Sequence, residues 1–411
     1  MKILFITAYM PNLVRVRPYN LLRQLALMGH AVTVCTLWTN EGERADISRL
    51  ESQNIKVYAL HQSKWRSLWN CLFALPTRTP LQAVFSWNPE LARLSEHLLE
   101  CNGKVDFDVI HVEHLRGARY GVYLKSRFPD VPVVWDSVDC ISYLFGQASD
   151  QSRSSFGRVV TRLDLNRTRR YEGQLPSRVD HVLITSQVDQ QALFDLSPDK
   201  KAAAPISILP NGVDWEYFGQ DSEVEREPAT LVLSGKMSYH ANVTMALFLI
   251  NQIMPQVWAK RQDVRVLIVG KDPPNAVRAL ANNPQVSVTG TVNDMRPYLQ
   301  KASVAVVPLL YGAGLQNKIL EAMACSTPVV ATPQAVQALD VVPDQDILLG
   351  VAPVDLAGQV LKLIEDPDYQ KQVGQAGRRY VEKNHQWSKI AKVLEGVYHE
   401  VISTRHWRRI Q

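Results

Sequence analysis

The chain has 411 residues, 46% of them hydrophobic and 21% charged, which is the composition of an ordinary globular protein with a sizeable core. At about 100 to 200 residues per domain, this length predicts two or three domains. No apolar run reaches the roughly 18 residues that span a bilayer, and a net charge of +5 is too small to indicate a nucleic-acid-binding protein. The five cysteines lack CxxC spacing, which argues for a reducing compartment and against a zinc site.

The positive charge is unevenly distributed. Residues 1–205 contain 25 Lys and Arg against 20 Asp and Glu, whereas the rest of the chain contains 20 of each. An excess in the N-terminal half would favour an anionic partner or a membrane surface. We expect a cytoplasmic protein that is at most peripheral at the inner face of the membrane.

The first segment, Lys2 to Ala8, is a short apolar run that is ended by Pro11 and Asn12, so it predicts a buried parallel strand rather than a signal peptide. A helical pattern follows and stops at Gly29, and a second strand is predicted at Ala31–Leu37. This order is a βαβ unit, and its repetition predicts a doubly wound α/β sheet.

Ligands of such sheets bind at the carboxyl ends of the strands. That rule places the loop Pro11–Arg17 at a ligand site, where Asn12, Arg15 and Arg17 could meet a phosphate or an acidic acceptor. The alternative is that these residues are only the solvated start of a helix.

Residues 63–75 (SKWRSLWNCLFAL) carry Trp, Leu and Phe at helical spacing beside Lys64 and Arg66. A basic amphipathic helix of this kind can lie in a membrane interface. A stripe with this period is more often turned toward the core, so both interpretations stay open.

Two further strands end in polar residues. After a predicted helix at Asn88–Leu99, the strand Asp108–Val112 leads into a group that could act in catalysis or bind a metal, although one strand end offers no clear third or fourth ligand. The strand Val131–Asp136 is followed by residues that could hold acceptor hydroxyls or cap the next helix. The first group comprises His111, Glu113 and His114, and the second comprises Asp136 and Asp139.

The first sheet is completed by an arginine-rich helix, 153–175, and by strands at Val179–Thr185 and Ile206–Leu209. The Asn211-Gly212 pair then predicts a turn. The acidic stretch Glu216–Pro228 has no pattern, as expected of a linker.

The second half repeats the alternation of strands and helices. Strands are predicted at Ala229–Ser234, Val264–Val269, Val286–Thr289 and Ser303–Leu309, and helices at Asn242–Trp258 and Asp294–Lys301. From Trp387 a last helix runs to about His406. Arg405, Trp407, Arg408 and Arg409 after it could touch anionic lipid, but a frayed tail is the more ordinary expectation.

The stretch 308–333, PLLYGAGLQNKILEAMACSTPVVATP, predicts a glycine loop, a helix at Leu315–Cys325 and another strand at Pro328–Ala331. Glycines let a ligand approach the backbone, and a helix that begins at such a loop directs its N–H groups at an anion. Lys318 near the helix start would meet a phosphate, and Glu321 one turn on could accept hydrogen bonds from ribose hydroxyls. The alternative is an ordinary surface pair three residues apart.

This run closely resembles the nucleotide-sugar motif of the retaining family 4 glycosyltransferases. The resemblance implies the GT-B fold, in which two Rossmann-like domains face a cleft and the C-terminal helix crosses back to the first domain. It implies an acceptor domain at residues 1–208, a donor domain at 209–386 and a returning helix at 387–411. Glu321 would hold the donor ribose, and the loop would hold the diphosphate and sugar through Tyr311, Gly312, Ala313, Gly314, Leu315, Gln316 and Asn317.

Other motifs carry the same resemblance. Gly235 and Lys236 match a Gly-Arg pair that contacts the β-phosphate, and Asn211 begins an NGVD motif found at the interdomain crossing. The loop Gly290, Thr291 and Val292 matches a segment that holds the nucleobase through backbone groups. The strand that ends at Val112 matches an HxH pattern whose second histidine touches the donor sugar.

The chain also departs from the family pattern. Most members carry a second glutamate where this chain has Ala313, Glu113 stands at the second His position, and Ala241 replaces a second basic residue. The first loop also lacks the paired glycines that are common there.

We therefore predict a retaining glycosyltransferase that moves a sugar from a nucleoside diphosphate to a hydroxyl of a glycan, lipid-linked or small-molecule acceptor, such as a bacterial cell-surface glycan. Lys236, Lys318 and the loop amides would stabilise the leaving diphosphate, so no metal or other cofactor is expected. A sugar-nucleotide epimerase of the same fold and a catalytically silent nucleotide-sugar-binding partner remain as alternatives. A dehydrogenase would need a GxGxxG after a first strand, which neither half contains.

Overall fold

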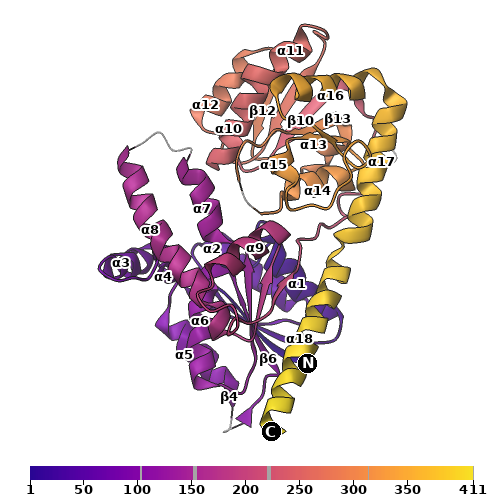
Figure 1. Ribbon diagram of the computed structural model, residues 1–411. Coiled ribbons are helices and arrows are strands. Elements are labelled where there is room, and N and C mark those ends of the chain that lie inside the picture. The colour runs from indigo at the N-terminus through magenta and orange to yellow at the C-terminus, as the bar shows by residue number, and fades with distance from the viewer. Residues whose placement is uncertain (102–103, 151–154, 220–223, 313, 411) are drawn as a thin grey trace. The chain divides into compact units, whose positions relative to one another are not determined.

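The computed structural model describes residues 1–101, 104–150, 155–219, 224–312 and 314–410, with the backbone alone described at 101, 104, 148–150, 155–163 and 406–410 (Figure 1). Its contacts divide the chain into two compact units. Unit 1 comprises Met1–Pro210 and Trp387–Gln411, and unit 2 comprises Asn211–Gln386.

The described part of unit 1 contains a seven-stranded sheet in the order β3-β2-β1-β6-β7-β8-β9. All of its neighbouring strands are parallel. The strands are β1 (Lys2–Thr7), β2 (Ala31–Trp38), β3 (Lys56–His61), β6 (Val109–Glu113), β7 (Val133–Val138), β8 (His181–Ile184) and β9 (Ile206–Ile208), and a small antiparallel pair is formed by β4 (Glu100–Cys101) and β5 (Lys104–Val105).

Helices cover both faces of this sheet, which explains why β1, β2 and β6 are buried on both sides and read as apolar runs. The edge strand β3, which the sequence did not predict, is only half-buried, so its apolar pattern is weak. The helices are α1 (Val16–Leu27), α2 (Glu41–Glu51), α3 (Lys64–Ala74), α4 (Leu81–Phe85), α5 (Pro89–Leu99), α6 (His114–Arg127), α7 (Ile141–Asp150), α8 (Ser155–Gln174), the short η1 (Pro176–Arg178), α9 (Gln187–Leu196) and α18 (Trp387–Ile410).

The last helix, α18, belongs to unit 1. Its apolar side chains, among them Leu394 and Tyr398, share a buried cluster with residues of β1, β2 and α1. Arg405 donates to the Asp180 carboxylate at 2.9 Å, so the expectation of a frayed, solvated tail is wrong at this residue. The side chains of Trp407, Arg408 and Arg409 lie outside the described residues.

Unit 2 has a six-stranded parallel sheet in its described part, in the order β12-β11-β10-β13-β14-β15. The strands are β10 (Glu227–Ser234), β11 (Arg265–Val269), β12 (Val286–Gly290), β13 (Ala302–Val307), β14 (Val329–Ala331) and β15 (Leu348–Leu349). The helices are α10 (His240–Phe248), the π-helical η2 (Leu249–Ile253), α11 (Met254–Trp258), α12 (Asn275–Arg278), the short η3 (Ala279–Asn282), α13 (Arg296–Lys301), α14 (Asn317–Ala324), α15 (Pro333–Val336), α16 (Pro353–Glu365) and α17 (Pro367–Asn384). The doubly wound α/β prediction is therefore confirmed for both halves.

Two expectations about unit 2 are corrected. The helix predicted at Asn242–Trp258 is interrupted by the π-turn η2, which ends two residues before Pro255, a residue with no N–H to donate. The predicted linker is shorter than expected, because β10 begins at Glu227. Arg226 before it donates to the carbonyls of Gln300, Ala302 and Cys325.

The segment at residues 63–75 forms α3, but its apolar stripe does not face the core. Trp65 and Phe73 are 72% and 71% exposed, whereas Ser67 and Ala74 on the other side of the helix are buried. The core-facing interpretation is therefore wrong. No helix among the described residues is long and apolar enough to cross a membrane.

Candidate active site

The glycine loop of unit 2 joins β13 to α14. Gly312 has φ 147° and Gly314 has φ 73°, values that favour glycine at both positions. Helix α14 starts after Gln316, and no side chain caps its first turn. Its first N–H groups are therefore available to an anion. Ala313 lies outside the described residues.

Lys318 lies in the first turn of α14 and reaches across to the end of β10. Its ammonium donates to Asn242 Oδ1 at 2.6 Å, and Asn242 Nδ2 donates to the carbonyl of Lys236 at 3.0 Å. A Cβ at Gly235 would lie 2.9 Å from Asn242 Nδ2, so glycine is required for this approach. The structure thus brings Gly235, Lys236 and Lys318 together through Asn242, a residue that the sequence analysis missed.

Lys318 and Glu321 both have perturbed pKa values. Burial lowers the pKa of Lys318 to about 8, and the nearby Glu321 carboxylate partly opposes this shift. Burial raises the pKa of Glu321 to about 6, and Lys318 opposes that shift. Incomplete charge compensation of this kind is typical of a site that is completed by a ligand.

Tyr311 in the glycine loop is held by two residues of α10. Its hydroxyl lies 2.9 Å from His240 Nδ1 and 3.1 Å from Thr244 Oγ1, and its ring stacks on His240 at a centroid distance of 5.4 Å. His240 and Thr244 follow no recognisable motif, and only the folded chain brings them to Tyr311.

The carbonyl of Gly312 accepts two side-chain amides from the segment after β14. Gln334 Nε2 donates at 2.6 Å and Gln337 Nε2 at 3.1 Å. The sequence analysis missed both glutamines. They fix the orientation of the peptide that precedes residue 313.

Asn211, which the sequence placed tentatively with the acceptor or phosphate groups, contacts the start of α14. Its Nδ2 donates to Asn317 Oδ1 at 3.4 Å, and its carbonyl lies 2.7 Å from His385 Nδ1. Asn211 therefore belongs to the same end of unit 2 as the glycine loop.

A surface cavity of about 710 Å³ is lined by Thr291 and Val292, two of the residues matched to the base-binding segment. Glu227 and Lys301 also line it. Thr291 follows the carboxyl end of β12, whereas Glu227 begins β10 and Lys301 precedes β13, so the cavity also reaches the amino ends of strands in this sheet.

In unit 1, Arg17 and Asp136 form a buried ion pair. Arg17 Nε donates to Asp136 Oδ2 at 2.9 Å and Nη2 donates to Oδ1 at 3.0 Å. Both side chains are nearly inaccessible to solvent. In this arrangement the guanidinium already holds a carboxylate, so Arg17 ties α1 to the end of β7.

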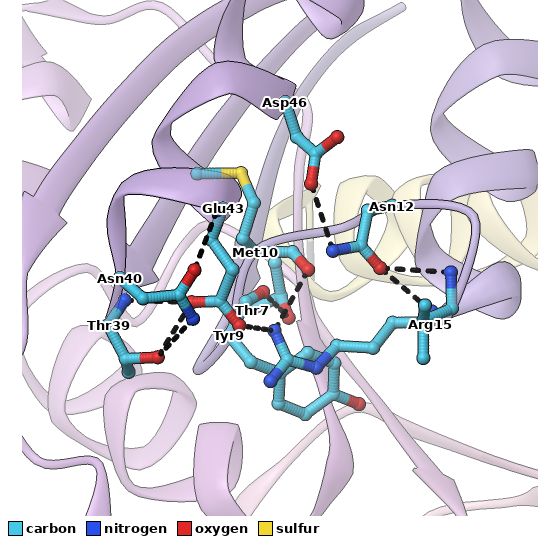
Figure 2. Close-up of polar contacts among 10 residues, drawn as sticks. Thr7, Tyr9, Met10, Asn12, Arg15, Thr39, Asn40, Glu43 and Asp46 are labelled. Atoms are coloured by element: carbon cyan, nitrogen blue, oxygen red, sulfur yellow. Dashed lines mark hydrogen bonds and ion pairs between the residues drawn. The ribbon is translucent and has the colours of Figure 1, made fainter. Parts of the chain in front are cut away.

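The loop after β1 is shaped by Asn12 and Arg15 (Figure 2). Asn12 Oδ1 accepts the N–H of Arg15 at 3.0 Å, and its Nδ2 donates to Asp46 at 3.0 Å. Arg15 donates to Glu43 at 2.8 Å and to the carbonyl of Met10 at 3.2 Å. Both predicted residues thus have structural partners in this structure.

His111 and Glu113 lie at the end of β6 and are fully buried. His111 stacks on Phe5, and its Nδ1 lies 2.8 Å from the hydroxyl of Tyr398 in α18. Burial lowers its pKa to about 4, so the ring is neutral at pH 7. A contribution of His111 to chemistry would be indirect, because its side chain has no exposed surface.

Glu113 is an unusual carboxyl group. None of the described residues donates a hydrogen bond to either of its oxygens, and the adjacent Thr7 hydroxyl donates to the carbonyl of Tyr9. Burial, followed by the negative charge of Asp136, raises the pKa of Glu113 to about 8. Glu113 is therefore mainly protonated at pH 7.

Next to it, His114 has φ 63°, and Val138, the last residue of β7, has φ 67°. Both values are uncommon for residues with a side chain, and for the β-branched Val138 this is a strained conformation. Burial lowers the pKa of His114 to about 4. The two strained positions mark the ends of neighbouring strands, where the sequence predicted functional residues.

Asp139 lies among further acids. Burial and the charge of Asp189 raise its pKa to about 7, and it accepts from Thr185 Oγ1 at 3.3 Å. Glu172 accepts the N–H groups of Ile141 and Ser142 at the start of α7, and burial raises its pKa to about 7. Within the described residues, no group of three or more His, Cys, Asp or Glu is arranged to hold a metal ion.

Comparison with known proteins identifies the family of the chain. Residues 14–217 match the family model described as Glycosyltransferase Family 4, and residues 228–366 match the model described as Glycosyl transferases group 1. The chain belongs to glycosyltransferase family 4. This family 4 chain is 24% identical over 315 residues to the MMP alpha-(1->4)-mannosyltransferase of Mycolicibacterium hassiacum, with 72% of each chain covered.

A second relative is a GDP-mannose-dependent monoacylated alpha-(1-6)-phosphatidylinositol monomannoside mannosyltransferase of Corynebacterium glutamicum. It is 31% identical over 156 residues, which cover 35% of this glycosyltransferase and 41% of the relative. Among solved structures, sucrose-phosphate synthase from Thermosynechococcus elongatus matches with a TM-score of 0.70 and 17% identity, covering 98% of this chain and 100% of that one. HepE of Anabaena, solved with UDP and glucose, matches with a TM-score of 0.66 and 14% identity. The match covers 97% of this chain and 100% of the HepE chain. At these identities the structures support the GT-B fold alone.

Proposed function

We propose that this glycosyltransferase transfers a hexose from a nucleoside-diphosphate sugar to an acceptor hydroxyl, with retention of the anomeric configuration and without a metal ion. The observation that carries the proposal is the position of Lys318, which is held beside Gly235 and Lys236 at the uncapped start of α14. These groups together present positive charge and N–H donors to a diphosphate.

Three groups of residues in unit 2 bind the diphosphate, the ribose and the base of the donor. The diphosphate is held by Lys318, Lys236 and the amides that follow Gly312. Glu321 accepts hydrogen bonds from the ribose hydroxyls, which favours its ionised form because hydrogen bonds to a carboxylate lower its pKa. The backbone of Gly290–Val292 faces the base.

Negative charge develops on the departing diphosphate as the bond between C1 of the sugar and the β-phosphate oxygen breaks. Donors that are already in place stabilise this charge without reorganisation. The acceptor oxygen bonds to C1 on the same face, and its proton passes to the departing phosphate oxygen. The proposal thus requires no protein nucleophile and no divalent cation.

Unit 1 is assigned the acceptor. His114 after β6 and Asp139 after β7 are partly exposed groups that can exchange hydrogen bonds with sugar hydroxyls, whereas the fully buried Glu113 contributes indirectly. Asp136 acts by holding Arg17 and is a positioning residue. The acceptor class we propose is a glycan or a lipid-linked sugar. The Corynebacterium relative is named for transfer to a phosphatidylinositol mannoside, which supports the lipid-linked case.

The test is a panel of nucleotide sugars headed by GDP-mannose and UDP-glucose, with EDTA present. We expect slow release of one nucleoside diphosphate by the wild-type chain and by Glu365→Ala, an exposed control in the same unit, but not by Glu321→Ala. With an acceptor, NMR of the product should show the anomeric configuration of the donor.

Four results would contradict the proposal. Inversion at C1 would exclude retention, and activity that EDTA abolishes would exclude a metal-independent reaction. Conversion of the donor to another nucleotide sugar without an acceptor would identify an epimerase. Tight binding without turnover would identify a silent binding partner, the alternative that Ala313 favours because it removes a carboxylate usual in the family.

A further inference from the structure

Helix α3 in unit 1 is amphipathic, but its apolar side is exposed and its polar side faces the unit. Its aromatic and leucine side chains follow the helical positions i, i+3, i+4, i+7 and i+8 and form one stripe. All of them are exposed, as is Leu75 just after the helix. The stripe comprises Trp65, Leu68, Trp69, Leu72 and Phe73.

The other side of α3 is attached to the unit by polar contacts. Asn70 Nδ2 donates to the carbonyls of Val84 at 3.0 Å and Trp87 at 2.8 Å. Arg66 donates to Asn88 at 2.8 Å and pairs with Glu90. The helix is therefore already formed and oriented with its apolar stripe outward, at the periphery of unit 1 beside α4 (Figure 1).

The charges around the stripe are mainly basic, and the acid Glu90 is paired with Arg66. Residues 52–89 contain four basic residues and no Asp or Glu. Lys64 precedes the stripe and Arg78 follows it, and both are exposed. A surface with this charge complements anionic headgroups, to which each Lys or Arg near the surface contributes about 1 kcal/mol.

We propose that α3 docks this glycosyltransferase on an anionic lipid bilayer. The helix has 11 residues and is about 16 Å long, so it is too short to span a membrane and would lie in its plane. Tryptophan is enriched at the membrane interface because its ring is apolar and its N–H is polar. A convex, uninterrupted apolar stripe between two cations offers few polar groups to specify a protein partner, whereas a bilayer requires none.

The experiment is flotation of the full chain with vesicles of phosphatidylcholine alone and of phosphatidylcholine mixed with phosphatidylglycerol. We expect binding to the mixed vesicles that weakens as salt is added. The triple variant Trp65→Ser, Trp69→Ser, Phe73→Ser should bind the vesicles at least about tenfold more weakly, because it removes most of the apolar area that the bilayer would bury. The matched control Val351→Ser, Val354→Ser, which changes two exposed apolar residues of unit 2, should bind like wild type.

A second variant separates charge from apolar contact. Lys64→Gln with Arg78→Gln should lower binding to the mixed vesicles by about 30-fold and leave the weak binding to phosphatidylcholine unchanged. None of these substitutions affects a residue of the donor site, so release of nucleoside diphosphate in solution should stay at the wild-type rate. Vesicle binding is therefore tested independently of the proposed reaction.

The proposal is overturned if the wild-type chain does not float with the mixed vesicles, or if the triple variant with an unchanged melting curve floats equally well. Analytical ultracentrifugation tests the other occupant of the stripe. Self-association that the triple variant loses, without vesicle binding by wild type, would show that α3 is an interface between two copies of the chain.

Discussion

The strand ends of the two units have opposite electrostatic character. In unit 2, Lys318 and the uncapped start of α14 lie beside a glycine loop, so this end of the sheet presents positive charge and N–H donors. In unit 1, Glu113, Asp136 and Asp139 lie close together, and the buried guanidinium of Arg17 is paired with Asp136. One doubly wound architecture thus supports a candidate anion site in one unit and, in the other, a group of carboxyls that includes two with raised pKa values, Glu113 and Asp139.

The difference follows from the loops and not from the sheets. Both sheets are parallel and buried, but the loop after β13 contains two glycines with positive φ, whereas the ends of β6 and β7 carry strained residues with side chains, His114 and Val138. Glycine exposes backbone N–H groups to a ligand, whereas the strand ends of unit 1 carry side-chain carboxyls. Each of the following predictions tests one side of this comparison.

The largest effect is expected for the buried ion pair of unit 1. Arg17→Met leaves the Asp136 carboxylate buried without its partner and should lower the free energy of unfolding of this unit by about 3 to 5 kcal/mol. Urea denaturation measures it. Arg127→Met, which removes a more exposed pair with Glu96, should cost at most about 1 kcal/mol. If Arg17→Met with Asp136→Leu recovered none of the loss, the uncompensated charge would not be its cause.

Lys318→Ala should lower kcat/KM for donor hydrolysis by about 10² to 10³, the usual loss when one preorganised donor to a developing charge is removed. Lys371→Ala, an exposed lysine of the same unit, is the control. Because burial lowers the pKa of Lys318 to about 8, nucleotide-sugar affinity of the wild-type chain should also fall as the pH rises above about 8. An affinity that stays constant up to pH 10 would contradict this role.

Glu321→Gln should weaken donor binding by about 1.5 to 3 kcal/mol, the range for hydrogen bonds to a charged group. Calorimetry with a nucleotide sugar and its 2′-deoxy analogue makes the test specific. Wild type should prefer the ribose donor, and the variant should bind both alike. An unchanged preference in Glu321→Gln would place the ribose elsewhere.

Glu113 should make unit 1 less stable as the pH rises. Its pKa of about 8 in the folded chain is above the ordinary value, so its stabilising protonation is complete below about pH 4.5 and is lost as the pH rises through 8. Glu113→Gln should remove this pH dependence. The free energy of unfolding of the variant minus that of wild type should be about 1 to 2 kcal/mol larger at pH 8 than at pH 5. This is less than the full pKa shift implies, because water enters around a buried charge. If wild type and Glu113→Gln differed in stability by the same amount at pH 5 and at pH 8 in urea denaturation, Glu113 would not titrate in this way.

The smallest effect is expected for the glutamines that hold the Gly312 carbonyl. Gln334→Leu with Gln337→Leu removes two hydrogen bonds of about 0.5 to 1.5 kcal/mol each. We expect KM for the donor to rise several-fold while kcat changes less than twofold, since the loop is loosened but Lys318 is untouched. Gln359→Leu, which removes a similar bond to the Leu349 carbonyl, is the control. Loss of kcat at unchanged KM would assign the glutamines to the chemical step.

Much of this molecule was predictable because the responsible forces are local. Buried parallel strands are continuous apolar runs, and the glycine loop with Lys318 and Glu321 lies in one short stretch of sequence. Asn242, Gln334 and Tyr398 were missed because their partners are 76, 22 and 287 residues away and no periodic pattern marks them.

The sequence by itself determined the alternation of strands and helices, the doubly wound class and the family, since these depend on periodicity and on a contiguous motif. Only the tertiary structure decided which way an amphipathic helix faces and which charges are compensated. Helix α3 has the pattern of a core helix, but Asn70 and Arg66 attach its polar side to the unit and leave its apolar stripe exposed. Arg17 could have met a phosphate, but the fold brings it to Asp136, because contact and burial depend on residues that are distant along the chain.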